Sequence, residues 1–240
     1  MAYYSFKEKY FKFEITMGTK KIGCVIAYRK GHTNYGTSLV GYALIKKIQK
    51  LGYDVEVINY VKRPTLIQKM AWVINAMRCG MGNVISDRLK GVKDLKNNAE
   101  YAANIKIRTD AVEAYKKRKL LPFFKDYVGF KALHDGSKKY DIIIVGSDQI
   151  WTPLSLPTKF FNLLFVDDKV RKVAYASSFG VSSIPEFQKK ATGAYLDRFH
   201  AIGVRELSGK KIVDALSRQT AHFPSGNNHA PTVSPVSAAR

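Results

Sequence analysis

The chain has 240 residues, 46% of them hydrophobic, and a formal net charge of +21. Its length fits one large domain, or one and a half small ones, and no apolar run approaches the roughly 18–20 residues needed to cross a bilayer. Cys24 and Cys79 have neither metal-site nor disulfide spacing, which favours a reducing cytoplasm and predicts no structural metal. The lysines are scattered, with a local cluster at 116–119, and no zinc-finger or RNA-binding signature accompanies them. We interpret this charge mainly as a solvated surface.

The amino-terminal part of the chain predicts a strand–helix–strand unit. Residues 1–19 lack periodicity and are interpreted as an extension, and 22–28 form the first strand. A helix is expected from Gly36 to about Leu51, capped by Asn34, Thr37 or Ser38, with Gly52 ending it. The second strand is 53–60, which gives a right-handed βαβ unit. The helical spacing predicts that four apolar side chains face the sheet: Val40, Leu44, Ile48 and Leu51.

The loop before this helix has the wrong spacing for a dinucleotide fingerprint, and it lacks the Lys-Ser/Thr pair of a P-loop. A polar loop that leads into a helix N-terminus is nevertheless a candidate anion site. A simple capped loop is the alternative. His32 is a weaker candidate ligand in the same loop.

Residues 63–98 are less regular. An amphipathic helix is expected over 66–77, with Met70 and Trp72 packing, followed by a basic helix over 101–121. Pro122 ends that helix, and Phe123 and Phe124 are interpreted as core residues. This insertion should cover an edge or a mouth of the sheet.

The stretch 141–151 carries the strongest signal in the sequence. Residues 142–145 are all β-branched, which is typical of a strand buried on both faces of a parallel sheet. Gly146 and Ser147 end it, and Asp148, Gln149 and Trp151 follow at once. Ligands of open parallel sheets bind beyond the carboxyl ends of the strands. This cluster is therefore a candidate site, with a turn capped by Asp148 as the alternative.

The remaining elements continue the alternating pattern. An extended segment is expected at 160–166, a strand at 172–177, a helix that begins with a capping box of Ser183 and Glu186, and a last strand at 201–204. This helix should carry Phe187, Ala191, Tyr195 and Phe199 on one face. A short helix capped by Ser208 follows. Parallel strands would bring four polar termini to one edge of the sheet: Asn34, Asp148, Ser177 and Arg205.

Four motifs in this order resemble the polysaccharide pyruvyl transferase family over about residues 20–217: Asn34-Tyr35-Gly36, the run 146–151, the run 174–180, and Val204-Arg205-Glu206. The resemblance implies an α/β fold, a Rossmann-like parallel sheet with flanking helices, as in the amino-terminal half of a glycosyltransferase-B-like two-domain protein. It also implies a cytoplasmic enzyme of surface-polysaccharide synthesis. Such an enzyme transfers the enolpyruvyl unit of phosphoenolpyruvate to a sugar, commonly as a cyclic ketal, and releases phosphate.

The resemblance assigns roles to individual residues. Asp148 is the catalytic candidate, because a carboxylate can accept the proton of a sugar hydroxyl or orient the sugar. Arg205 is the candidate for recognising the donor's carboxylate or phosphate, with an ion pair to Glu206 as its alternative role. The other substrate-binding candidates are Asn34, Tyr35, Gly36, Ser147, Gln149, Trp151, Ser177 and Ser178.

The resemblance implies no cofactor beyond phosphoenolpyruvate as donor substrate. The expected partners are this donor and a sugar acceptor, which could be linked to a nucleotide, a lipid phosphate or a polymer. No specific nucleic acid is expected, and a position near a membrane surface is compatible with the basic charge. The competing interpretation is a non-catalytic, basic Rossmann-like module that binds polyanions, either nucleic acid or anionic lipid.

Residues 218–240 differ from the rest in composition. Residues 219–239 contain no Asp, Glu, Lys or Arg and no Leu, Ile or Met. We predict a divergent, disordered tail in place of the family's second domain. A chain with only one wall of the cleft should be inactive by itself.

Overall fold

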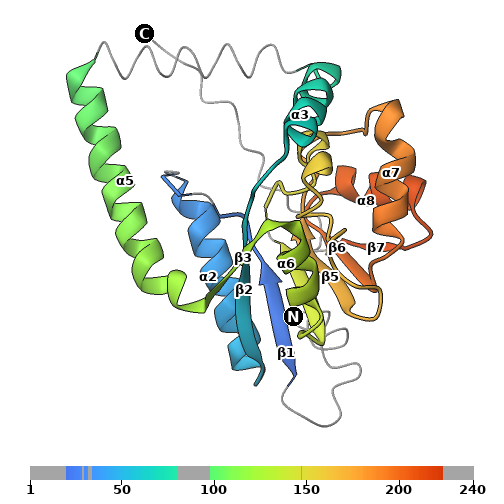
Figure 1. Ribbon diagram of the computed structural model, residues 1–240, viewed down its shortest axis with the longest axis horizontal. Coiled ribbons are helices and arrows are strands. Elements are labelled where there is room, and N and C mark those ends of the chain that lie inside the picture. Colours follow the sequence, from blue (N-terminus) through green and yellow to red (C-terminus); the bar gives the residue numbers. More distant parts are fainter. Residues whose placement is uncertain (1–19, 29, 32–33, 81–97, 147, 224–240) are drawn as a thin grey trace.

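The computed structural model describes residues 20–28, 30–31, 34–80, 98–146 and 148–223. These residues form a seven-stranded, fully parallel sheet in the order β3-β2-β1-β4-β5-β6-β7, with helices packed against it (Figure 1). The strands are β1 (Lys21–Val25), β2 (Asp54–Val61), β3 (Phe124–Val128), β4 (Ile142–Gly146), β5 (Arg171–Ser177), β6 (Ala201–Val204) and β7 (Ala221–His222). The helices are α2 (Tyr35–Lys50), α3 (Leu66–Arg78), α5 (Ala99–Lys119), α6 (Gly129–Ser137), α7 (Glu186–Leu196) and α8 (Leu207–Leu216), with 3₁₀ turns η1 (Leu121–Phe123) and η2 (Pro153–Thr158). The predicted Rossmann-like α/β fold is confirmed.

The central strand is β4, as the sequence predicts. It pairs with β1 on one side and β5 on the other, with Ile144 opposite both Cys24 and Val173. Ile143, Ile144 and Val145 are fully buried. An unbroken apolar run is needed here because both faces of the strand are covered.

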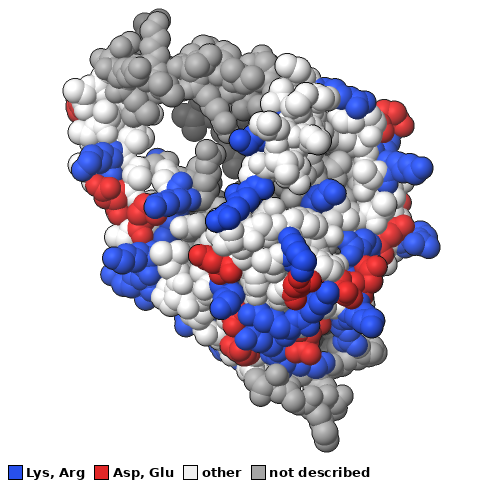
Figure 2. Space-filling view, viewed as in Figure 1, with Lys and Arg blue, Asp and Glu red and all other residues white. Residues whose placement is uncertain are grey.

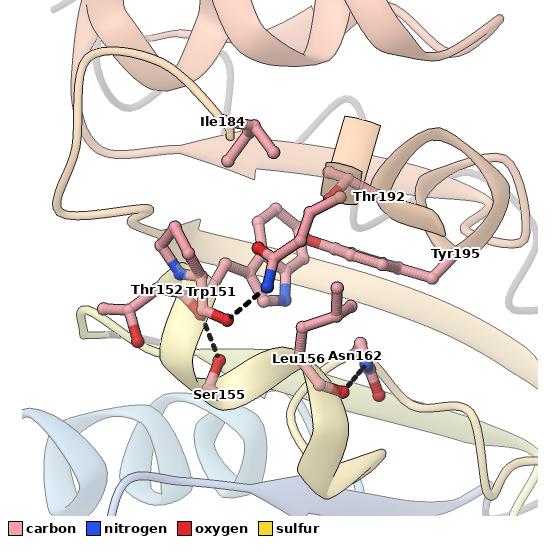
Figure 3. Close-up of a pocket in the computed structure, with 10 residues that line it drawn as sticks. Trp151, Thr152, Ser155, Leu156, Asn162, Ile184, Thr192 and Tyr195 are labelled. Atoms are coloured by element: carbon pink, nitrogen blue, oxygen red, sulfur yellow. Dashed lines mark hydrogen bonds between the residues drawn. The ribbon is translucent and has the colours of Figure 1, made fainter. Parts of the chain in front are cut away.

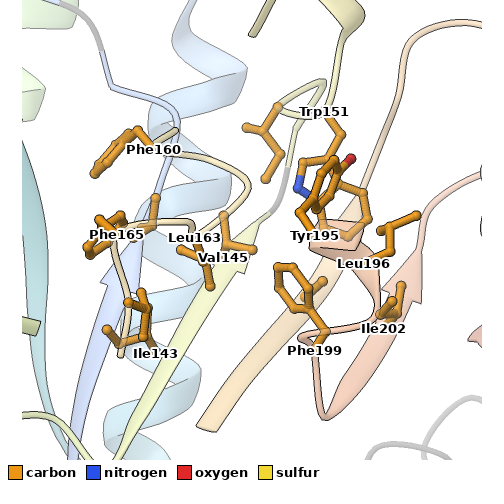
Figure 4. Packing of buried hydrophobic residues seen from close by; sticks show 14 of the residues in the cluster. Ile143, Val145, Trp151, Phe160, Leu163, Phe165, Tyr195, Leu196, Phe199 and Ile202 are labelled. Carbon is orange, nitrogen blue, oxygen red and sulfur yellow. The ribbon is translucent and has the colours of Figure 1, made fainter. Parts of the chain in front are cut away.

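Two hydrophobic clusters lie on the sheet. The first joins β4 and β6 to α6, α7, α8 and the segment 160–170, and Figure 4 shows Phe165, Leu163 and Val145 in one part of it and Trp151, Tyr195 and Phe199 in another. The second joins β1, β2 and α2. Helices therefore pack on the sheet through these two clusters, and the carboxyl ends of the strands remain available for a site.

Helix α2 begins as expected, because Asn34 is its N-cap and the Asn34 side chain accepts a hydrogen bond from the Thr37 N–H at 3.3 Å. Gly52 follows its end with a positive φ of 89°. Leu44 and Ile48 are buried as predicted. The prediction is wrong for Val40 and Leu51, which are exposed, because the helix turns Ser38, Gly41 and Ile45 toward the sheet instead.

Four elements differ from the expectations in the middle and at the end of the chain. Residues 124–128 form edge strand β3, parallel to β2, and 129–137 form α6, neither of which the sequence predicted. Residues 160–166 are turns rather than extended chain. The tail expected to pack little apolar surface begins with β7, where Ala221 is buried against β6, while 224–240 lie outside the described residues.

Helix α7 also differs from its prediction. Pro185 is the N-cap and no side chain caps the helix, so the expected capping box of Ser183 and Glu186 is absent. Of the four residues expected on one face, Phe187 and Ala191 are exposed, whereas Tyr195 and Phe199 are buried. Helix α8 starts after Glu206, likewise with no side-chain cap from Ser208. Gly193 allows α7 to lie close to the end of α8, because a Cβ there would lie 2.2 Å from the Leu216 carbonyl oxygen.

The amino-terminal ends of the strands are joined by a polar network. Glu56 on β2 accepts hydrogen bonds from Lys139 at 2.6 Å and from the Tyr140 hydroxyl at 2.8 Å, and it forms an ion pair with Lys21. Tyr140 also hydrogen-bonds Tyr127 on β3 at 3.0 Å. Burial alone would raise the pKa of Glu56, but the bonds from Lys139, Lys21 and Tyr140 outweigh it and lower the pKa to about 2.

At the carboxyl ends of β4 and β5, Gly146 lies opposite Tyr175. Gly146 has a φ of 151°, and a Cβ there would lie 2.0 Å from the Tyr175 carbonyl oxygen. The pairing of β5 with β6 shifts register between Ala174 and Ser177, and Ala176 has a positive φ of 51°.

Candidate functional site

A cavity of about 650 Å³ lies at the carboxyl ends of β1, β2 and β4. In the strand order, β1 and β4 are the neighbours at which the direction of sheet growth reverses, and this is where open α/β sheets bind ligands. A volume of this size is typical of a small-molecule site. The residues that line it are Ile26, Ala27, Tyr28, Asn34, Thr37, Ser38, Val57, Ile58, Asn59, Tyr60, Lys62, Lys116, Phe124, Asp148, Gln149, Phe160 and Phe161.

Asp148 follows β4 at this switch point and connects it to α2. One of its carboxylate oxygens accepts the Thr37 hydroxyl at 2.8 Å, and the other accepts the Gln149 N–H at 2.8 Å. Its backbone carbonyl accepts N–H bonds from Ile150 at 2.8 Å and Ser178 at 3.0 Å. These bonds fix the carboxylate, yet each of its oxygens has a second lone pair with which it could accept a substrate hydroxyl.

The N-terminus of α2 faces this carboxylate. The first turn of α2 has no acidic residue of its own, so Asp148 supplies the negative charge that the helix dipole favours there. Tyr35 packs edge-on against Tyr115 of α5 at 5.0 Å, and Gly36 leaves room beside Asn34, whose Oδ1 would lie 3.3 Å from an added Cβ. Asn34 lines the cavity, whereas Tyr35 and Gly36 shape the helix start.

Two lysines bring positive charge to the cavity. Lys116 is buried, forms an ion pair with Glu113 at 2.7 Å and lies over the Tyr28 ring at 5.5 Å. Glu113 also accepts the Gly31 N–H at 3.0 Å; burial would raise its pKa, but the bonds from Lys116 and Gly31 lower it. The interpretation of 116–119 as solvated surface is therefore wrong for Lys116.

Lys62, at the end of β2, is the second cavity lysine. Its ammonium lies 5.5 Å from the centre of the Trp72 ring, and desolvation by the surrounding walls lowers its pKa. The cavity thus combines a fixed carboxylate with two ammonium groups. Among the described residues, no group of three or more His, Cys, Asp or Glu side chains could hold a metal ion.

The family follows from comparison with known proteins. Residues 34–217, most of the chain, match the sequence model of the family described as polysaccharide pyruvyl transferase. The chain belongs to this transferase family. A search of curated proteins found no match. In the described part of the chain, no helix is long and apolar enough to cross a membrane.

Two serines of the family motif at the end of β5 have structural partners in this family member. Ser177 is buried and its Oγ lies 3.5 Å from the Val145 carbonyl oxygen. Ser178 is also buried and donates to a Glu206 carboxylate oxygen at 2.7 Å, which accepts the Phe179 N–H at 3.2 Å as well. Neither serine lines the cavity, so both position the loop beside Asp148. Glu206, which the sequence suggested only as a partner for Arg205, holds that loop.

Arg205 follows β6, two strands away from β4 in the sheet. Its side chain is exposed, its Nε lies 3.8 Å from a Glu206 carboxylate oxygen, and it is not among the residues that line the cavity. The four polar strand ends do share one edge of the parallel sheet, as predicted. The structure brings Asn34 and Asp148 together at the cavity and leaves Arg205 outside it.

Trp151 belongs to the core rather than to the cavity. It is only 3% exposed, packs against Phe179, Tyr195 and Phe199, and donates its indole N–H to the Phe161 carbonyl at 3.0 Å. Figure 3 shows it in the wall of a separate pocket of about 10 Å³, between η2 and α7. Gln149 lines the main cavity. Ser147 and His32 lie outside the described residues.

Proposed function

We propose that this family member binds phosphoenolpyruvate and a sugar in the switch-point cavity and takes part in pyruvyl transfer between them. The observation that carries the proposal is the fixed Asp148 carboxylate, which faces a cavity that also contains Lys62 and Lys116. The donor carries a carboxylate and a phosphate on a small frame, and ammonium groups attract such an anion. The acceptor needs a base or an orienting carboxylate at its hydroxyl.

In the proposed reaction, one sugar hydroxyl oxygen adds to C2 of the enol while C3 gains a proton. A second hydroxyl of the same sugar then displaces phosphate at C2, which completes a cyclic ketal. Two hydroxyl protons are lost, one is gained at C3, and the other leaves with phosphate. Asp148 would accept a hydroxyl proton, and Asn34 and Gln149 would donate hydrogen bonds to substrate oxygens.

Electrostatics distinguishes the proposed donor position from the proposed sugar position in the cavity. The N-terminus of α2 already faces Asp148, so the anionic donor would bind closer to Lys62 and Lys116 than to that helix. The sugar would then lie between the donor and Asp148. This arrangement assigns donor binding to the lysines and proton transfer to the carboxylate.

The test is isothermal titration of the purified chain with phosphoenolpyruvate, with pyruvate and inorganic phosphate as partial ligands. Lys62→Gln should weaken donor binding by roughly ten-fold or more, because a hydrogen bond to a charged group contributes about 1.5–3 kcal/mol. Lys131→Gln, on the exposed face of α6, is the matched control and should leave binding unchanged.

Asp148→Asn should not weaken donor binding, since it removes a negative charge from the cavity. In any preparation that releases phosphate in the presence of acceptor, Asp148→Asn should lower that release by about 100-fold or more. Absence of saturable binding, or binding that is indifferent to Lys62→Gln, would refute the proposed donor site. Undiminished phosphate release by Asp148→Asn would remove that residue from the reaction.

A further inference from the structure

We propose that the outward face of α3 docks in the interface of an anionic lipid bilayer. The inference concerns a surface outside the cavity and does not depend on the proposed reaction. It rests on the orientation of the helix, on the identity of its exposed side chains and on the charges at its borders.

Helix α3 turns its polar side, rather than its apolar side, toward the protein. Its inward side makes polar contacts: the Trp72 indole N–H donates to the Pro157 carbonyl at 3.4 Å, and Asn75 donates to the Pro153 carbonyl at 3.2 Å. Gln188 of α7 donates to the Asn75 side-chain oxygen at 2.6 Å. None of the residues of α3 is buried. A surface helix normally buries its apolar stripe, so this orientation requires another explanation.

The apolar side chains of α3 point away from the protein. At 100° per residue, six of them fall within an arc of about 120°. Leu66, Ile67 and Met77 are 76%, 80% and 73% exposed, and every member of the set is at least half exposed: Leu66, Ile67, Met70, Val73, Ile74 and Met77. Scattered apolar residues need no explanation, but a contiguous patch of this kind marks an interaction surface. Figure 2 shows a largely uncharged area over α3.

The charges around this arc favour an anionic surface. Lys69 and Arg78 fall on its two borders by the same helical count, and Arg63 precedes the helix. No Asp or Glu occurs anywhere from residue 57 to 86. An apolar arc bordered by basic residues is the pattern of a helix that lies in the plane of a membrane interface, where acyl chains meet anionic headgroups.

The length and position of α3 agree with this orientation. Thirteen residues extend about 20 Å, too short to span a bilayer but sufficient to lie along its surface. Figure 1 places α3 toward the carboxyl ends of the strands, and Lys62 contacts Trp72 while it lines the cavity. A docked α3 would therefore bring the mouth of the cavity near the membrane.

The test is flotation of the full chain with vesicles of phosphatidylcholine alone and with 30% phosphatidylglycerol. We expect binding to the anionic vesicles only, and weaker binding as salt rises. Met70→Gln combined with Ile74→Gln should lower the partition coefficient by about ten-fold or more, because each removes apolar contact. Lys69→Gln should lower it about five-fold. Ile107→Gln, an equally exposed apolar position on α5, is the control and should have no effect.

The variants should fold because the substituted side chains are exposed, and circular dichroism would check this. Absence of wild-type binding, equal binding to neutral vesicles, or unchanged binding by the Met70/Ile74 double variant would overturn the proposal. Light scattering adds a further decisive outcome. If the wild type self-associates and the double variant is a monomer, a second copy of the chain covers this face and the membrane assignment is wrong.

Discussion

The backbone conformation of Gly146 and its position opposite Tyr175 predict that Gly146→Ala destabilises the fold more than a one-carbon change usually does. Gly146 has a φ of 151°, a conformation that costs an L-residue about 1–3 kcal/mol. The added Cβ would also lie 2.0 Å from the Tyr175 carbonyl oxygen and 3.0 Å from its carbon. Both contacts are with backbone, so the two strands must separate to relieve them.

Forced displacement in a packed interior adds roughly 1–3 kcal/mol to the cost of the backbone conformation. We expect Gly146→Ala to lower the free energy of unfolding by about 4 kcal/mol. That is a large fraction of the roughly 5–15 kcal/mol typical of a domain. The melting temperature should fall by about 8–16 °C for a chain of this size.

Urea unfolding followed by circular dichroism measures this difference directly. Gly203→Ala on β6 is the matched control, because an added Cβ there would lie 3.4 Å from the Ala174 carbonyl oxygen, an ordinary contact. It should stay within about 1 kcal/mol of the wild type. A Gly146→Ala protein that unfolds at the same urea concentration as Gly203→Ala would refute the steric reasoning.

Two further predictions concern charge. Glu56 has a folded-state pKa of about 2 against an ordinary value of 4.5, so its stabilisation is present above pH 4.5 and is lost as pH falls toward 2. Glu56→Gln should therefore lower the free energy of unfolding by about 1–2 kcal/mol at pH 7, allowing for solvent screening. The loss should be much smaller at pH 2.5. Equal losses at both pH values would contradict the lowered pKa of Glu56. Glu206→Ala should cost about 1–3 kcal/mol because it leaves the buried Ser178 hydroxyl without its acceptor. A double-mutant cycle with Ser178→Ala should give a coupling of about 1 kcal/mol or more, and a coupling near zero would contradict the contact's role.

The sequence predicts those parts of the fold whose signals are local. Strand β4 is recognisable because a strand covered on both faces must be apolar throughout. Helix α2 is recognisable from Asn34 at its start and Gly52 after its end. Strand β3 was missed because an edge strand can remain half polar, as Phe-Lys-Asp-Tyr-Val is, and it then resembles a loop.

The candidate site could be predicted only in part. Asp148 and Asn34 could be placed, because parallel strands bring their carboxyl ends to one edge. Lys116 could not be, since its burial depends on how α5 packs beside Tyr28, and no pattern in a basic helix marks one lysine as buried. Trp151 was expected at the ligand because of its motif, yet its ring fills the core. Met70 was expected to pack because apolar helix faces normally turn inward, and α3 does not follow that rule.

The pairing of β1 with β4 also has a consequence for folding while the chain is being synthesised. Lys21 on β1 donates its backbone N–H to Asp141, which lies 120 residues later at the start of β4. By contrast, β4, β5, β6 and β7 are consecutive both in the chain and in the sheet. At roughly 5–20 residues per second, a ribosome leaves one edge of β1 without its partner for about ten seconds. The exposed edge of that apolar strand is open to pairing with other nascent chains during this interval. Substitutions that slow the formation of β4 should therefore reduce the yield of soluble protein more than they reduce the stability of the protein that has folded.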